Sequence, residues 1–213
     1  MQVRPRILSP FLSGLADLFW PPRCAACDLY TENVFCRICE DTMLPSTGAQ
    51  LLSFPRSAAW DLATCRFEFG GQLAVAIRRA KYAEWGSALA RQLGRLLAPL
   101  PSADLVIPVP LHPRRLRVRG FNQAAELVRG AGERPALSHL SRIRDTPPQT
   151  DKPPRARLGN VAGAFSARNV FGAHVLLVDD VMTTGATADA CVRALRQAGA
   201  AAVSVLALAR APA

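Results

Sequence analysis

Histidine and aromatic side chains are scarce in this 213-residue chain, which has 3 His and 7% aromatic residues. His112, His139 and His174 show none of the spacings typical of metal ligands, and no Gly-x-Ser-x-Gly pattern indicates a serine hydrolase. Nucleophilic catalysis of that kind is therefore unsupported. The aromatic residues are not interleaved with the basic ones, which argues against a base-stacking platform for single-stranded nucleic acid.

Long apolar runs are missing as well. The longest stretches without a charged residue, 42–55 and 197–209, have 14 and 13 residues, whereas about 20 apolar residues are needed to span a bilayer. The N-terminal apolar stretch is interrupted by prolines and Asp17, and no small-residue cleavage site follows it. We therefore expect a cytoplasmic protein without a transmembrane helix.

Basic residues outnumber acidic ones by 26 to 16, which gives a net charge of +10. Residues 112–157 contain ten Arg and one Lys against four acidic residues, so this segment alone carries +7. A concentrated positive charge favours an anionic partner or substrate. The charge does not distinguish between a nucleotide, a nucleic acid and a lipid.

Four of the six cysteines form two Cys-x-x-Cys pairs near the N-terminus. Four thiolates on two such turns match tetrahedral Zn²⁺ in a closed structural site, with no position left for water or substrate. A redox dithiol is disfavoured because such a site needs one pair beside a βαβ unit, and both pairs lie outside it. The eight-residue spacer leaves the type of zinc fold open. The predicted zinc ligands are Cys24, Cys27, Cys36 and Cys39.

The rest of the chain alternates between predicted strands and helices. Apolar spacing predicts an N-terminal helix that ends at Trp20, a linker at 45–55, and helices on both sides of Gly86. Such alternation indicates an α/β fold with a parallel sheet. Downstream, we predict strands at 104–110, 175–178 and 202–209, helices at 122–129 and 188–198, and a mobile proline-rich loop at 145–157.

The most informative stretch is residues 175–187, where four apolar residues precede two acids and a Thr-rich turn. The carboxylates of Asp179 and Asp180 can accept hydrogen bonds from sugar hydroxyls or hold Mg²⁺ through water. Gly185 permits a tight turn whose N–H groups, with the following helix N-terminus, can cradle a phosphate. The remaining members of the loop are Thr183, Thr184, Ala186 and Thr187.

This stretch is similar to the phosphoribosyl-pyrophosphate (PRPP) signature of type I phosphoribosyltransferases, although many members have Gly where this chain has Ala186. Together with the Cys₄ module, the Arg119-Gly-Phe-Asn-Gln123 motif resembles the ComF family (ComFC, amidophosphoribosyltransferase-like) in order and spacing. A second pattern also resembles the ComF family, and it consists of Arg142, Thr146, Gln149, Arg157, Asn160 and Gly163-Ala-Phe165.

The resemblance implies a double-zinc-ribbon-like N-terminal module at 1–58 and a phosphoribosyltransferase-like domain at 59–213. It also implies a link to natural transformation, the uptake of DNA as single strands. Asp179 and Asp180 would contact the ribose hydroxyls and indirectly Mg²⁺, and Thr183 to Thr187 the 5′-phosphate. The diphosphate would be bound by Arg114, Arg115 and Arg119. A flexible lid would include Arg142, Gln149 and Arg157.

No residue is firmly assigned to catalysis. Arg119 and Lys81 are candidates, and Lys81 either reaches the diphosphate or belongs to a solvated helix face. We expect a ComF-type protein that binds PRPP or a related ribose phosphate in DNA uptake. The alternatives are a non-catalytic competence factor that holds single-stranded DNA or a DNA-uptake helicase, and a regulator that senses PRPP. The sequence shows no dedicated acceptor pocket.

Overall fold

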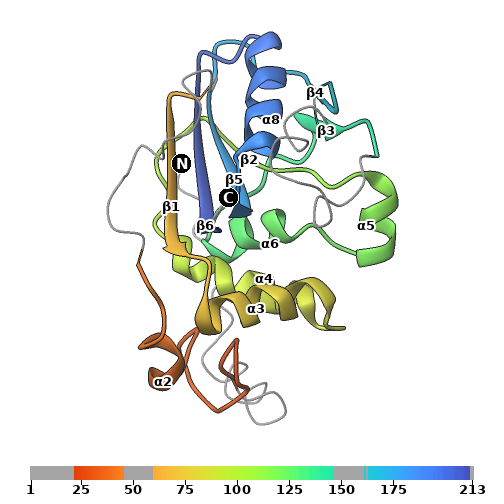
Figure 1. The fold of residues 1–213 in the computed structure, drawn as a ribbon. Helices are drawn as coiled ribbons and strands as arrows, with labels where there is room; N and C mark the ends of the chain where they lie inside the picture. The colour runs from red at the N-terminus through yellow and green to blue at the C-terminus, as the bar shows by residue number, and fades with distance from the viewer. Residues whose placement is uncertain (1–21, 46–59, 146–160, 162, 212–213) are drawn as a thin grey trace, which may run out of the picture.

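The protein is described here from a computed structural model, which covers residues 22–45, 60–145, 161 and 163–211. A four-stranded parallel sheet forms its centre, in the order β1-β6-β5-β2 (Figure 1). Parallel neighbours require crossover connections, which are usually helical. This sheet with its flanking helices confirms the predicted α/β fold. The strands are β1 (Leu62–Glu68), β2 (Leu105–Pro108), β5 (His174–Met182) and β6 (Ala202–Arg210).

Side chains of β5 alternate between two cores, one on each face of the sheet. Val175 and Leu177 are buried with residues of α8 (Ala186–Gln197), which lies along one face (Figure 1). Leu176 and Val178 are buried in the other core, which includes residues of helices α3, α4 and α6. Burial on both faces explains why residues 175–178 are a continuous apolar run rather than an alternating one.

The helices of this second core begin and end close to the predicted positions. They are α3 (Gly71–Tyr82), α4 (Gly86–Gly94), which continues into the 3₁₀ turn η1 (Arg95–Leu97), and α6 (Gln123–Gly130). Gly94 and Gly130 lie where α4 and α6 pack backbone to backbone. A Cβ atom on either would overlap main-chain atoms of the other helix.

Several elements differ from the sequence prediction. Strand β5 continues through Asp179 and Asp180 to Met182, so these acids lie in the strand rather than in the loop that follows it. Three further elements were not predicted: β1, the helix α5 (Pro113–Arg119) and the antiparallel pair β3 (Leu140–Arg142) and β4 (Phe165–Ala167). None of the α5 side chains is buried, so this helix lacks the apolar stripe that reveals a helix in a sequence.

The cysteine module packs against α3 and α4 (Figure 1). The Arg79 guanidinium donates hydrogen bonds to the carbonyl of Ala26 at 2.7 Å and to the Asp28 carboxylate at 2.6 Å. From α4, Gln92 Nε2 donates to the Arg23 carbonyl at 2.8 Å. These contacts tie the module to the two helices that also cover the sheet.

Some predictions lie outside the described residues. These are the N-terminal helix, most of the linker and of the proline-rich loop, and the boundary at residues 58 and 59, which stays a prediction. Thr146, Gln149, Arg157 and Asn160 also lie outside them. Within the described part of the chain, no helix is long and apolar enough to cross a membrane.

Candidate functional site

A cavity of about 350 Å³ lies beyond the carboxyl ends of β2 and β5, and we call it the Asp180 cavity. In open parallel α/β sheets, ligands bind in the crevice outside the carboxyl ends of the strands. The cavity walls combine carboxylates, guanidinium groups and amides. They include Lys81, Val109, Arg115, Arg119, Asn122, Gln123, Arg142, Asp179, Asp180 and Thr187.

The two aspartates sit near the end of β5. Asp179 Oδ1 accepts a hydrogen bond from the Asp180 N–H at 2.9 Å, and Asp180 Oδ1 accepts one from the Val181 N–H at 2.8 Å. The other Asp180 oxygen forms an ion pair with Lys81 Nζ at 2.7 Å. Lys81 therefore lines the Asp180 cavity and is paired with one of its carboxylates.

The pKa of the Asp179 carboxyl is raised to about 8. Burial is the largest cause, and the neighbouring Asp180 carboxylate adds to it, while Lys81 acts in the opposite direction. The protonated form of Asp179 is therefore favoured near neutral pH, next to the ion pair between Asp180 and Lys81. A carboxyl in this state donates a hydrogen bond as well as accepting one.

Three arginines also line the Asp180 cavity. Arg115 and Arg119 come from α5, and Arg142 comes from β3 with its guanidinium over the Phe165 ring, 5.5 Å from the centroid. Burial, with the neighbouring Arg115, lowers the pKa of Arg142. Arg119 donates a hydrogen bond to Oε1 of Gln123. A cavity with this wall favours an anionic ligand.

The predicted phosphate loop connects β5 to α8. Gly185 caps α8 in a left-handed conformation, with φ of 75°, as its role in a tight turn predicts. Thr187, in the first turn of α8, lines the Asp180 cavity, whereas Thr183, Thr184 and Ala186 do not line it. The loop thus lies next to the cavity and contributes one hydroxyl to its wall.

A second, larger cavity of about 690 Å³ adjoins the first, and we call it the Phe121 cavity. The two share Lys81, Tyr82, Arg115 and Arg119. Arg114 lies only in the second, where its Nη1 is 3.5 Å from Asp145 Oδ2. The structure therefore brings most of the described predicted site residues together and places Arg114 beside them.

Three polar residues that line the Asp180 cavity were not predicted as site residues: Tyr82, Asn122 and Gln123. Asn122 has a structural role, because its Nδ2 donates to the Val109 carbonyl at 3.0 Å and its Oδ1 caps α6. The Arg119-Gly-Phe-Asn-Gln123 motif was the signal that pointed to this segment.

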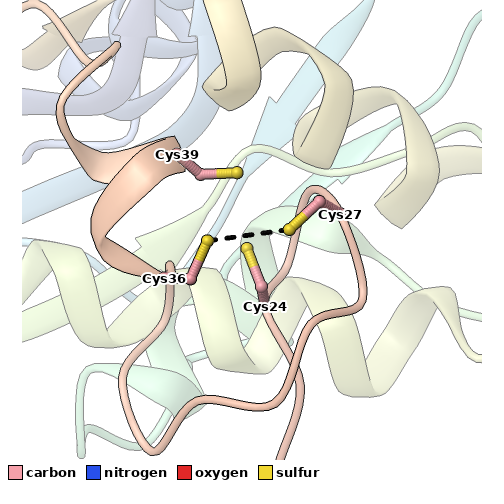
Figure 2. A group of neighbouring side chains, drawn as sticks. All are labelled: Cys24, Cys27, Cys36 and Cys39. Atoms are coloured by element: carbon pink, nitrogen blue, oxygen red, sulfur yellow. Dashed lines mark hydrogen bonds between the residues drawn. The ribbon is translucent and has the colours of Figure 1, made fainter.

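The four predicted zinc ligands form a separate cluster (Figure 2). Their sulfur atoms lie within 4.8 Å of one another, and Cys27 Sγ is 3.6 Å from Cys36 Sγ. Sulfurs around a tetrahedral zinc ion are about 3.8 Å apart, since each Zn–S bond is about 2.3 Å. The cluster therefore fits zinc.

Backbone turns hold these cysteines in place. The Cys24 N–H donates to the Leu29 carbonyl at 2.8 Å, and the Cys36 carbonyl accepts from the Cys39 N–H at 3.0 Å. Burial raises the pKa of the Cys24 thiol, but hydrogen bonds from backbone N–H groups outweigh it and set the pKa at about 6. A thiolate is therefore favoured at Cys24 at neutral pH, and the thiolate is the form that binds metal.

Comparison with known proteins agrees with these features. Residues 128–213 match the phosphoribosyl transferase domain family. The DNA utilization protein YhgH of Escherichia coli K12 is 30% identical over 204 residues, which cover 88% of this chain and 89% of that protein. Competence protein F of Haemophilus influenzae is 33% identical over 173 residues, covering 72% and 74%. The chain belongs to the ComF family.

Another relative from this family is competence protein ComFC of Streptococcus pneumoniae, 35% identical over 107 residues that cover 49% of this chain and 47% of that protein. Among solved structures, a glutamine PRPP amidotransferase from B. subtilis is 27% identical and covers 57% of this chain and 26% of that one. The TM-score between that structure and this ComF-family chain is 0.39.

Proposed function

We propose that this chain binds PRPP, or a related ribose phosphate, with Mg²⁺ in the Asp180 cavity and serves DNA uptake. The observation that supports this most is the composition of the cavity wall, which combines the aspartates near the end of β5 with arginines of α5 and β3. A ribose phosphate needs both, because its hydroxyls bind carboxylates and its phosphoryl oxygens bind guanidinium groups. The names of the curated relatives support the link to DNA.

Each group has a proposed role. Asp179 and Asp180 bind the ribose hydroxyls, and they hold Mg²⁺ through water. The loop from Thr183 to Thr187 binds the 5′-phosphate with its N–H groups and hydroxyls. Mg²⁺ neutralises charge on the diphosphate when it is bound. The diphosphate is contacted by Arg115 and Arg119, with Lys81, Arg114 and the Arg142 segment, including Gln149 and Arg157, as further candidates.

In a transfer reaction, the bond between the anomeric carbon and the diphosphate oxygen would break and an acceptor would form a new bond to that carbon. The arginines would stabilise the departing diphosphate, and a closed cavity would exclude water. Arg119 and Lys81 are the candidates closest to this chemistry, since both line the Asp180 cavity. The acceptor is unassigned.

The Cys₄ cluster is proposed as a structural zinc site. All four positions of a tetrahedral ion would be filled by Cys24, Cys27, Cys36 and Cys39. Zinc would hold the module in the conformation that contacts α3 through Arg79.

A second candidate function, binding of single-stranded DNA, is favoured by the composition of α5. Four of its seven residues are arginine, and none of the seven is buried. If these side chains contact DNA phosphates, log K should fall with log[salt] with a slope of about −0.7 per contact. An affinity for oligonucleotides that is insensitive to salt would contradict DNA binding by α5.

Thermal shift measurements would test the main proposal. Ligands that bind only the folded chain raise its melting temperature. We expect Mg²⁺ with PRPP to stabilise the protein more than PRPP with a chelator, and ribose without phosphate to have no effect. Equal melting curves with and without Mg²⁺ and PRPP would contradict the proposal.

A further inference from the structure

The proposed function leaves most of the Phe121 cavity without a ligand. The cavity has a volume of about 690 Å³, and three apolar side chains, Tyr82, Val118 and Phe121, line it together with charged groups. Ligand pockets of this size are typically lined by apolar and aromatic side chains with a few polar groups. Tyr82 is 80% exposed and Val118 is 92% exposed, so both are accessible to a ligand.

The Phe121 ring is held in place by packing. It lies against the core that α3, α4 and α6 share. The end of the ring is so close to Gly86, the first residue of α4, that a Cβ atom there would come within 3.0 Å of it. Tyr82 ends α3, four residues earlier in the chain. One aromatic ring of the cavity is therefore fixed by the core before any ligand binds.

The charged groups of the Phe121 cavity fall into two sets. The first set also lines the Asp180 cavity, where we propose that it contacts the diphosphate, and it consists of Lys81, Arg115 and Arg119. The second set belongs to the Phe121 cavity and not to the Asp180 cavity, and it consists of Glu84, Arg114 and Asp145. Two carboxylates against one guanidinium give this second set a net negative charge. A ribose phosphate in the Asp180 cavity would neutralise the shared cations and leave the Phe121 cavity acidic.

The two carboxylates of the second set differ in their partners. Asp145 Oδ2 lies 3.5 Å from Arg114 Nη1. Glu84 is exposed and forms no ion pair with any residue that the structure describes. A carboxylate attracts a cation, and so do the negative faces of aromatic rings such as Tyr82 and Phe121. Carboxylate and rings in one cavity therefore favour a cationic ligand with an apolar body.

We propose that the Phe121 cavity binds an organic ammonium ion with a flat apolar body, the second reactant of the ribose phosphate in the Asp180 cavity. The rings of Tyr82 and Phe121 contact the apolar body, and Glu84 contacts the ammonium group. The inference rests on the proposed function, because the ribose phosphate neutralises the shared cations. It identifies the chemical class of the unassigned acceptor.

The transfer to such a reactant needs no oxidant or reductant. The ammonium ion first loses a proton to water. The amine nitrogen then forms a bond to the anomeric carbon, while the bond from this carbon to the diphosphate oxygen breaks and diphosphate departs with the electron pair. The nitrogen finally releases a second proton to water. The products are an N-linked ribose phosphate and diphosphate.

Three probes of similar shape separate the effect of charge from that of size. At neutral pH benzylamine is a cation, benzyl alcohol is neutral and benzoate is an anion. Ligand-observed nuclear magnetic resonance titrations of the zinc-loaded full chain measure their affinities. With saturating PRPP and Mg²⁺, benzylamine should bind at least about threefold more tightly than benzyl alcohol, and benzoate should bind most weakly. With Mg²⁺ alone, benzoate should bind more tightly than benzylamine, because no phosphate then neutralises the shared cations.

Two substitutions test the assigned contacts in the PRPP-loaded protein. Glu84→Gln should weaken benzylamine about three- to fivefold and leave benzyl alcohol unchanged. Tyr82→Leu, which keeps an apolar side chain without a ring, should weaken benzylamine about two- to fivefold. The matched controls are Glu133→Gln and Tyr30→Leu, because both residues are exposed and line neither cavity. The controls should bind all three probes like the wild type.

The outcomes separate this inference from the proposed function. If the PRPP-loaded wild type binds benzylamine and benzyl alcohol equally, or Glu84→Gln binds benzylamine like the wild type, the ammonium site is wrong while the proposed function stands. Displacement of benzylamine by single-stranded oligothymidylate, with no effect of Glu84→Gln, would assign the cavity to a nucleobase and also overturn the inference. A wild type that binds no PRPP overturns the proposed function and this inference with it.

Discussion

Asp179→Asn should stabilise the unliganded protein, although it removes a residue proposed to bind ligand. In the folded protein the pKa of Asp179 is raised to about 8 from its ordinary value of 3.8. Between these two values the folded state keeps a proton that the unfolded state has lost. The stability contributed by this group therefore falls as pH rises from about 4 to 8, and it is constant above 8.

The magnitude follows from the linkage relation. Each pH unit in this range changes the free energy of unfolding by up to about 1.4 kcal/mol, so the change between pH 5 and 7.5 is about 3 kcal/mol. The Asp179 side chain is partly exposed, so solvent screens its charge. We therefore expect a change in the free energy of unfolding that is about half as large. Asn carries no such dependence, and its Oδ1 can still accept from the Asp180 N–H.

Circular dichroism melting from pH 4.5 to 8.5 measures the effect. The melting temperature of Asp179→Asn should exceed that of the wild type by about 3–8 °C at pH 7.5 and by little at pH 4.5, since 1 kcal/mol corresponds to about 2–4 °C at this chain length. The neighbouring Asp180→Asn should instead destabilise the protein, by about 1–3 kcal/mol, because it breaks the ion pair with Lys81. A difference between Asp179→Asn and wild type that does not vary with pH would refute the reasoning.

Three further outcomes are expected. Gly130→Ala should cost about 1–3 kcal/mol or more in chemical denaturation, because its Cβ would overlap the Arg91 carbonyl, whereas Gly70→Ala, with open space around it, should be nearly neutral. Arg79→Met should increase protease cleavage of the cysteine module, since three hydrogen bonds to that module are lost. Removal of zinc by a chelator should lower the melting temperature and weaken PRPP binding, because α3 carries both Arg79, which contacts the cysteine module, and Lys81, which lines the cavity. Unchanged PRPP binding would show that the module does not influence the Asp180 cavity.

The segment from β5 to β6 was predictable because its signals are local. The apolar run before Asp179, the glycine at 185 and the apolar periodicity of α8 each depend on neighbours in the sequence. The cysteine cluster was equally visible, because its ligands occur at short fixed spacings. For these parts, the structure confirms the fold and brings the predicted groups together.

Other features depend on contacts between distant segments. The sequence left two alternatives for Lys81, a contact with the diphosphate or a solvated helix face. Its position 2.7 Å from Asp180 depends on the packing of α3 against the sheet. Gln123 was not predicted because glutamine is mostly exposed in proteins. Strand β1 was missed for another reason: most of its side chains are at least partly exposed, so it lacks the apolar pattern of a buried strand.

The central claim is that the Asp180 cavity binds a ribose phosphate with Mg²⁺ through the two aspartates. The most direct test is calorimetric titration of the zinc-loaded protein with PRPP and Mg²⁺, comparing the wild type with the double variant Asp179→Asn/Asp180→Asn. The account predicts saturable binding by the wild type and at least a hundredfold loss in a variant whose far-ultraviolet spectrum is unchanged. No binding by the wild type, or equal binding by both proteins, would contradict it.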